Sequence, residues 1–204
     1  MTAAAEPGHD RAEVRAMLTG AVQLGMLTVG GVVAFALLSR AMSGSAEIVV
    51  QAVLVALGGA VCAYVPSLPV RPRTVDGIAW AALVGLLGAL VFSVVDTAVL
   101  RPLHLYHWTW DAIGGGSGFW YLPVWWMGSA VLAWLGALTL ATLARGGREP
   151  AVLLTGLLTA GLAIVLFGLV TALRLLPFHA AVMGLAFAIA LVLHVAFATL
   201  TTRR

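Results

Sequence analysis

The chain has 204 residues, of which 62% are hydrophobic and only 9% are charged, and its mean hydropathy is +1.05. A water-soluble domain carries about a quarter charged residues, so this composition excludes an ordinary soluble protein. All eleven basic residues are arginines, scattered between apolar runs rather than gathered on one face, which excludes nucleic acid as a partner. The single cysteine, Cys62, excludes an internal disulfide.

Six apolar runs follow a polar N-terminal tail over residues 1–16, and each is near the roughly 20 residues that cross about 30 Å of hydrocarbon. The runs are Met17–Leu38, Ala46–Val65, Gly77–Leu100, Tyr121–Ala144, Pro150–Leu173 and Phe178–Leu200. We therefore predict an all-α fold, a polytopic membrane helix bundle of about six transmembrane helices. Residues 17–204 would form a single domain whose surroundings are the lipid bilayer.

The arginines predict the orientation of this bundle. With six spans, eight arginines fall on the side of the two termini and three fall on the opposite side. The first group is Arg11, Arg15, Arg71, Arg73, Arg145, Arg148, Arg203 and Arg204, and the second is Arg40, Arg101 and Arg174. Positive charge in short loops stays inside the cell, so both termini are expected to be cytoplasmic. The protein is accordingly expected to be a multi-pass protein of the plasma (inner) membrane.

Small residues spaced four apart predict where helix backbones approach each other closely. They occur in the second, third and sixth runs, as Ala52, Ala56 and Ala60, as Ala81, Gly85 and Ala89, and as Gly184 and Ala188. The pattern bears on helix packing and not on function.

Asp96 lies inside the third apolar run, about one helical turn from its end. A carboxylate at this depth costs free energy unless it is paired, hydrated or protonated. Two interpretations remain open: a structural role, as an ion pair with Arg101 or Arg174 or at a water-exposed helix end, or a functional acid. His194 lies in the sixth run toward the other side of the membrane, and we expect its ring to bond to a neighbouring helix rather than to Asp96.

The connection 101–120 is rich in aromatic residues, and five of the seven tryptophans fall between Trp108 and Trp126. An interfacial aromatic belt accounts for two or three of them but less easily for their concentration on one connection. His104, His107 and Asp111 have spacings that would share one face of a helix, which makes the two histidines candidate metal ligands. No phosphate-binding loop occurs, and the sequence leaves any cofactor unknown.

Residues 95–137 read VDTAVLRPLHLYHWTWDAIGGGSGFWYLPVWWMGSAVLAWLGA. This stretch resembles the carotenoid-biosynthesis membrane proteins of the bisanhydrobacterioruberin hydratase type. The shared elements are an aspartate before a proline, a W-x-W pair, glycines, an aromatic residue, and a proline that opens a helix ending in tryptophan. The matching positions are Asp96, Pro102, Trp108, Trp110, Gly118, Tyr121, Pro123 and Trp134. The resemblance implies acid-catalysed hydration or cyclisation of a double bond in a lipophilic isoprenoid substrate.

The residue types suit that chemistry. A carboxyl group kept protonated by an apolar setting can donate a proton, and aromatic faces attract the resulting cation when water is scarce. The candidate catalytic residues are Asp96, Trp108, Trp110 and Asp111. Two alternatives stay open: a non-enzymatic accessory subunit or assembly factor of a larger membrane complex, and a small transporter.

Overall fold

The structure is a computed structural model that describes residues 7–105, 121–147 and 149–202. Six α-helices occupy these residues: α1 (Pro7–Ala41), α2 (Gly44–Tyr64), α3 (Val75–Val95), α5 (Tyr121–Arg145), α6 (Val152–Ala172) and α7 (Ala180–Thr202). A 3₁₀ turn, η1 (Val65–Ser67), follows α2, and a π-helical segment, η2 (Asp96–Leu100), continues α3. All six helices are long and apolar enough to cross a membrane, which confirms the predicted multi-pass helical bundle.

The helix ends follow local sequence signals. The Thr74 side chain caps α3 by accepting a hydrogen bond from the Gly77 amide at 3.1 Å. Pro66 has no amide hydrogen to donate, and α2 gives way there to the 3₁₀ turn. The largest difference from the predicted spans is in α1, which begins at Pro7 rather than Met17. Hydropathy marks where a helix enters the membrane, whereas a polar helix can continue beyond it.

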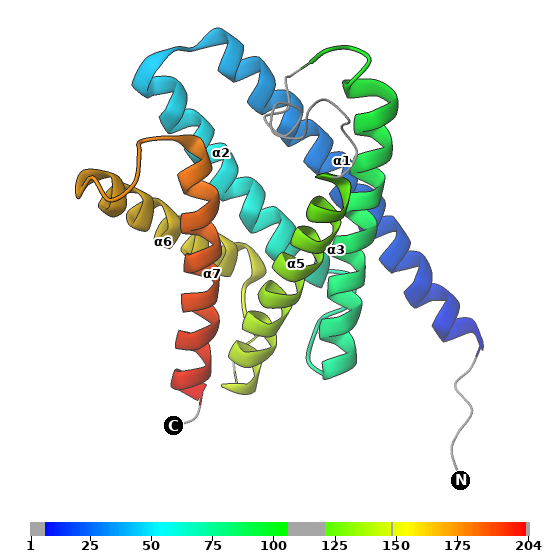
Figure 1. The fold of residues 1–204 in the computed structure, drawn as a ribbon. Coiled ribbons are helices and arrows are strands. Elements are labelled where there is room, and N and C mark those ends of the chain that lie inside the picture. The colour runs from blue at the N-terminus through cyan, green and yellow to red at the C-terminus, as the bar shows by residue number, and fades with distance from the viewer. Residues whose placement is uncertain (1–6, 106–120, 148, 203–204) are drawn as a thin grey trace.

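The helices form one bundle with a clear division of contacts (Figure 1). Helices α2, α5, α6 and α7 pack against one another, except that α5 and α6 share no extensive contact. Helix α3 packs against α5, and α1 lies across α3 and α2. The first turns of α1 and the last turns of α7 lie at the same end of the bundle, together with the connection 65–74 and the end of α5; we call this end the termini face. The connection 42–43 and residues 101–105 belong to the opposite face.

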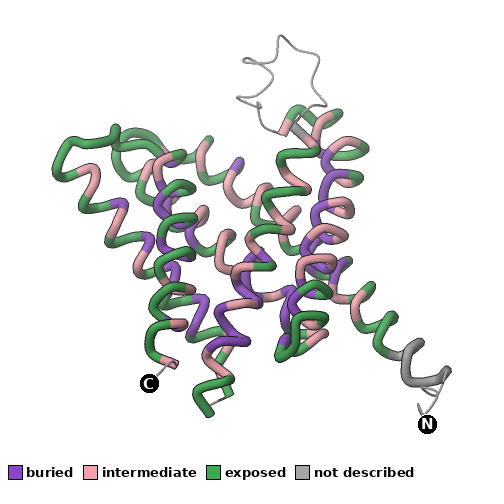
Figure 2. The backbone as a smooth tube through the Cα atoms, turned by 60° about the horizontal axis from the view of Figure 1, so that its bottom comes forward, coloured by how far each residue is buried: buried purple, intermediate pink, exposed green. Residues whose placement is uncertain are grey.

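The outward surfaces of the helices are apolar. Figure 2 shows exposed positions along the outer sides of the helices and buried positions where helices face each other. Large side chains such as Leu153, Val165 and Leu200 are exposed on these outer sides. Hydrocarbon suits such a surface because the outward side chains are apolar. The backbone polar groups inside each helix are hydrogen-bonded within the helix and need no water.

Two of the three predicted small-residue stripes lie at helix contacts. Gly85 is buried, and a Cβ atom added there would meet Ala133 Cβ at 2.6 Å and the Ser129 carbonyl oxygen at 2.9 Å. Ala52 and Ala56 are likewise buried. The prediction for Gly184 and Ala188 is wrong, since both are exposed. The buried face of α7 instead carries Met183, Ala186, Phe187, Ala190 and Leu191. Because small residues occur on both faces of this helix, their spacing alone did not identify the packed face.

The orientation gives a direct test. A periplasmic reporter such as alkaline phosphatase is expected to be active when fused at Gly115 and inactive at the C-terminus, because the sequence assigns eight of the eleven arginines to the side of the termini. A cytoplasmic reporter such as green fluorescent protein should give the opposite pattern. Cytoplasmic signals from both positions would contradict the six-span topology.

Candidate functional site

Asp96 is the first residue of the π-helical segment η2, where α3 reaches the opposite face. Its carbonyl oxygen accepts a hydrogen bond from the Arg101 amide five residues later, at 2.9 Å. Pro102 follows Arg101 and has no backbone N–H to donate, so the regular α-helical hydrogen bonding does not continue through it. The π-helical segment is the last turn of the helix, a place where such turns are common, and it sets Asp96 at the helix end.

The Asp96 side chain is completely buried and forms an ion pair with Arg101. The Asp96 Oδ2 atom lies 3.7 Å from Arg101 Nε, and the Arg101 side chain is 22% exposed. Of the two arginines considered from the sequence, Arg174 is exposed, in a left-handed turn after α6 (φ 55°). The structure therefore supplies the ion pair that was one of the two open interpretations, and it keeps the carboxyl group away from solvent.

The end of α3 that carries Asp96 is joined to the start of α5 by two tryptophans. Trp126 donates its indole N–H to the hydroxyl of Ser93 at 3.0 Å, and Ser93 in turn donates to the Ala89 carbonyl at 2.7 Å. The Trp125 ring packs on Phe92, with centroids 5.8 Å apart and planes inclined by 56°. Ser93 precedes Asp96 by three positions, so the two share one face of the helix.

Sequence reasoning did not select Ser93, Trp125 or Trp126 as site residues. The available signal was the three-residue spacing of Ser93 from Asp96, together with a Trp pair at the head of the following helix. That signal does not predict that the end of α3 contacts the start of α5. The contact depends on how α3 and α5 pack, which places the first turns of α5 beside the last turns of α3.

The other predicted site residues fall largely outside the described residues. Trp108, Trp110, Asp111 and His107 lie there, so the structure does not test their roles. His104 is described and exposed, in a left-handed conformation (φ 48°), and its carbonyl oxygen accepts a hydrogen bond from Arg40 at 2.9 Å. Within the described part of the chain, no group of three potential ligands is arranged to hold a metal ion. The two-histidine metal site stays a prediction.

A second polar cluster lies inside the bundle, nearer the termini face. Thr159 on α6 is fully buried, and its hydroxyl lies 2.7 Å from the Tyr64 hydroxyl on α2 and 2.7 Å from His194 Nδ1 on α7. It also lies 3.0 Å from the Thr155 carbonyl oxygen. The expectation that His194 bonds to a neighbouring helix is thereby confirmed.

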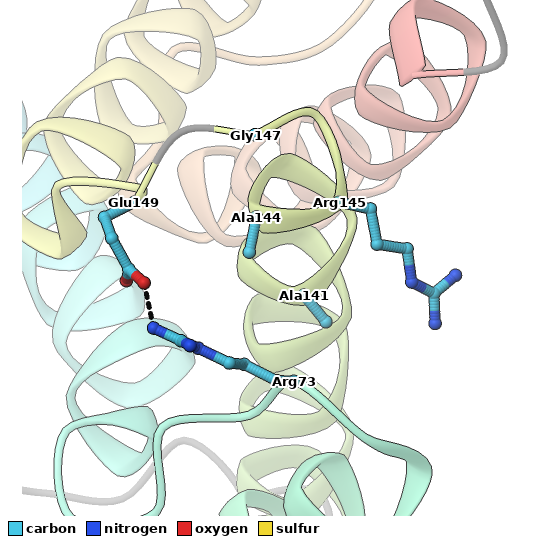
Figure 3. Close-up of a pocket in the computed structure, with 6 residues that line it drawn as sticks. All are labelled: Arg73, Ala141, Ala144, Arg145, Gly147 and Glu149. Atoms are coloured by element: carbon cyan, nitrogen blue, oxygen red, sulfur yellow. Dashed lines mark hydrogen bonds and ion pairs between the residues drawn. The ribbon is translucent and has the colours of Figure 1, made fainter.

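A hollow of about 260 Å³ opens on the termini face (Figure 3). Its lining residues are Arg73, Ala141, Ala144, Arg145, Gly147 and Glu149. Arg73 reaches across it to form an ion pair with Glu149, whereas Arg145 points away from both. Both partners are exposed, so the pair contributes about 0–1 kcal/mol. The hollow is remote from Asp96, which lies at the opposite face.

Comparison with known proteins adds no assignment: no family model, curated protein or solved structure matches the chain. The site has to be interpreted from its own geometry.

Proposed function

We propose that this chain is a multi-pass protein of the plasma (inner) membrane that acts on a lipophilic isoprenoid, by acid-catalysed addition to a carbon–carbon double bond. The observation that carries the proposal is the completely buried carboxyl group of Asp96 at the C-terminal end of α3. Intramembrane carboxyl groups are costly and serve function by default. The resemblance of residues 95–137 to hydratase-type carotenoid proteins points to the same residue and the same chemistry.

The reaction begins with proton transfer. The Asp96 carboxyl O–H bond breaks, and the double bond's electron pair forms a new C–H bond, which leaves a tertiary carbocation and a carboxylate. In hydration, water adds to the cation and returns a proton to the carboxylate. In cyclisation, a second double bond attacks the cation to form a C–C bond, and the new cation loses a proton to the carboxylate, which gives a new double bond. Aromatic faces stabilise such a cation, a role open to Trp125 and Trp126 and to the predicted Trp108 and Trp110.

Arg101 has a defined part in this scheme. Its guanidinium favours the charged form of a carboxyl group, so it stabilises the carboxylate that remains after proton donation. The carboxyl group has to take up a proton once to become a donor, and each turnover then returns a proton to it. The Asp96 Oδ2 atom lies 3.7 Å from Arg101 Nε, within the range of an ion pair, so the guanidinium is placed to act on that carboxylate.

Replacing Asp96 by asparagine tests the proposal. The variant keeps the size of the side chain but has no ionisable proton, so it is expected to fold and to lose conversion of an acyclic isoprenoid by at least about a hundredfold. The purified protein in nanodiscs would be incubated with an acyclic carotenoid, and hydrated and cyclised products would be separated by mass spectrometry and chromatography.

Asp76→Asn is the matched control, because Asp76 is an exposed carboxylate in the first turn of the same helix. It should convert substrate as the parent protein does. If Asp96→Asn kept both full conversion and full thermal stability, the catalytic role would be wrong. The accessory subunit of a larger membrane complex would then be the better account.

A further inference from the structure

Gln23 is an uncharged polar residue on the outer side of the membrane-spanning part of α1. It follows Met17, the first residue of the apolar run, by six positions, which places it roughly 9 Å into the run along the helix axis. Its side chain is exposed, and no hydrogen bond joins its amide to any residue that the structure describes. Hydrocarbon offers neither donors nor acceptors, so a polar group at this depth needs a partner in another protein segment.

The only other glutamine of the chain shows what such a group gains from partners. Gln51 on α2 donates hydrogen bonds to the Ser39 hydroxyl at 2.8 Å and to the Glu47 carboxylate at 2.9 Å. On α1, by contrast, Thr19 is exposed one turn before Gln23, and its hydroxyl also has no hydrogen bond within the described part of the chain. Residues four apart are neighbours on a helix surface, so these two polar groups share one side of α1.

This side of α1 is turned away from the bundle. Helix α1 packs against α3 and α2 (Figure 1), and Leu24 and Gly25 lie buried in its contact with α3. Successive helical residues are rotated by about 100°, so Thr19, Gln23 and Gly30 lie on nearly the opposite side. A Cβ atom added at Gly30 would meet nothing within 4 Å. We call the side that carries these three residues the outer face of α1.

The spacing along the outer face favours another helix as the partner. Thr19, Gln23, Met26 and Gly30 are separated by four, three and four positions, and all four are exposed. This alternation is the repeat with which two helices pack along a common seam. A glycine on such a seam allows the two backbones to approach closely, and polar side chains in membrane helices bond across it.

A second copy of the chain fits this face because the face is complementary to itself. A glutamine amide contains both donors and an acceptor, so two glutamines can bond to each other reciprocally. Two copies inserted in the same orientation are related by a two-fold axis along the membrane normal, which places each residue of α1 at the same depth as its counterpart. Gln23 then meets Gln23 and Gly30 meets Gly30, with no charge on either residue to repel the other copy.

We propose that the chain forms a homodimer in the membrane through the outer faces of α1. The two Gln23 amides bond to each other across the two-fold axis, and the paired Gly30 residues allow the helices to approach. This interface does not depend on the activity proposed for Asp96.

Resonance energy transfer between copies of the full chain tests the dimer. Copies labelled at the C-terminus with a donor or an acceptor dye would be mixed in phosphatidylcholine vesicles, and the energy transfer should fall as lipid is added, which gives a dissociation constant. Gln23→Leu should raise that constant by roughly tenfold, the scale of an interhelical hydrogen bond. Gln23→Asn keeps an amide and should restore most of the affinity. Transfer that does not depend on dilution in the parent, or an unchanged constant for Gln23→Leu, would overturn the proposal.

The adjacent glycines Gly30 and Gly31 provide a matched pair of variants. Both are exposed, and an added Cβ atom would meet nothing within 4 Å at either, but Gly31 points about 100° away from the outer face. Gly30→Leu should therefore raise the dissociation constant, whereas Gly31→Leu should leave it unchanged. Both variants should melt in detergent at the temperature of the parent. Equal effects of the two substitutions on energy transfer would show that the copies do not meet at this face.

Discussion

Replacing Gly136 by alanine is expected to destabilise the bundle more than any other addition of a single methyl group to a glycine in the described helices. A Cβ atom at Gly136 would overlap the backbone carbonyl oxygen of Ala63, so α5 and α2 would have to move apart. A carbonyl in a helix cannot rotate away as a side chain can. Overpacking costs typically about 1–3 kcal/mol, and this position should lie at the upper end of that range.

Gly128 provides a matched control on the same helix, because a Cβ atom there would meet nothing within 4 Å. Gly128→Ala should be neutral or slightly stabilising, since alanine favours helix more than glycine does. Thermal unfolding in detergent, followed by circular dichroism, would compare both variants with the parent. Equal melting temperatures for Gly136→Ala and the parent would mean that α2 and α5 do not approach at this point.

Replacing Arg101 by glutamine is expected to cost about 3 kcal/mol of stability, the lower end of the range for removing one partner of a buried ion pair. The reason is that the Asp96 carboxyl group is fully buried and would lose its guanidinium. The lower end applies because the Arg101 side chain is itself 22% exposed. The loss should appear as a lower melting temperature in detergent.

A double-mutant cycle separates this pair from other effects. Combining Arg101→Gln with Asp96→Asn should restore part of the lost stability, because neither charge is then left in the membrane end of α3. Arg174→Gln is the control, since Arg174 lies on the same face but is exposed. Additive effects of the two substitutions, with no recovery, would show that Asp96 and Arg101 are not coupled.

The cycle also bears on the proposed activity. If Asp96 is a proton donor whose carboxylate Arg101 stabilises, Arg101→Gln should lower turnover even under conditions where the variant is fully folded. If the pair is only structural, a folded Arg101→Gln protein should show no change in conversion. Stability and turnover measured on the same sample therefore distinguish the two roles.

Some residues of the Asp96 site could be identified from the sequence, but the contacts between them could not be predicted. The short spacing between Asp96 and Arg101 indicated an ion pair as one of two interpretations. It did not reveal the π-helical segment between them, nor the contact of Trp126 with Ser93, which lie 33 positions apart in the chain. Those features depend on the packing of α3 against α5.

The sequence by itself determined the class of fold and the limits of the spans, because the thickness of hydrocarbon sets both the length and the apolarity of a crossing helix. It also indicated the sidedness, through the arginines. Only the tertiary structure decided which face of each helix is buried. The helices are apolar nearly all round, and lipid accepts an outward leucine as readily as the interior does, so hydropathy carries little information about facing. For that reason, two kinds of contact could be seen only in the packed bundle: the close approach of Gly136 to Ala63, and the contacts of Thr159 with Tyr64 and His194. For the same reason, Gly184 and Ala188 face outward although their spacing predicted a helix contact.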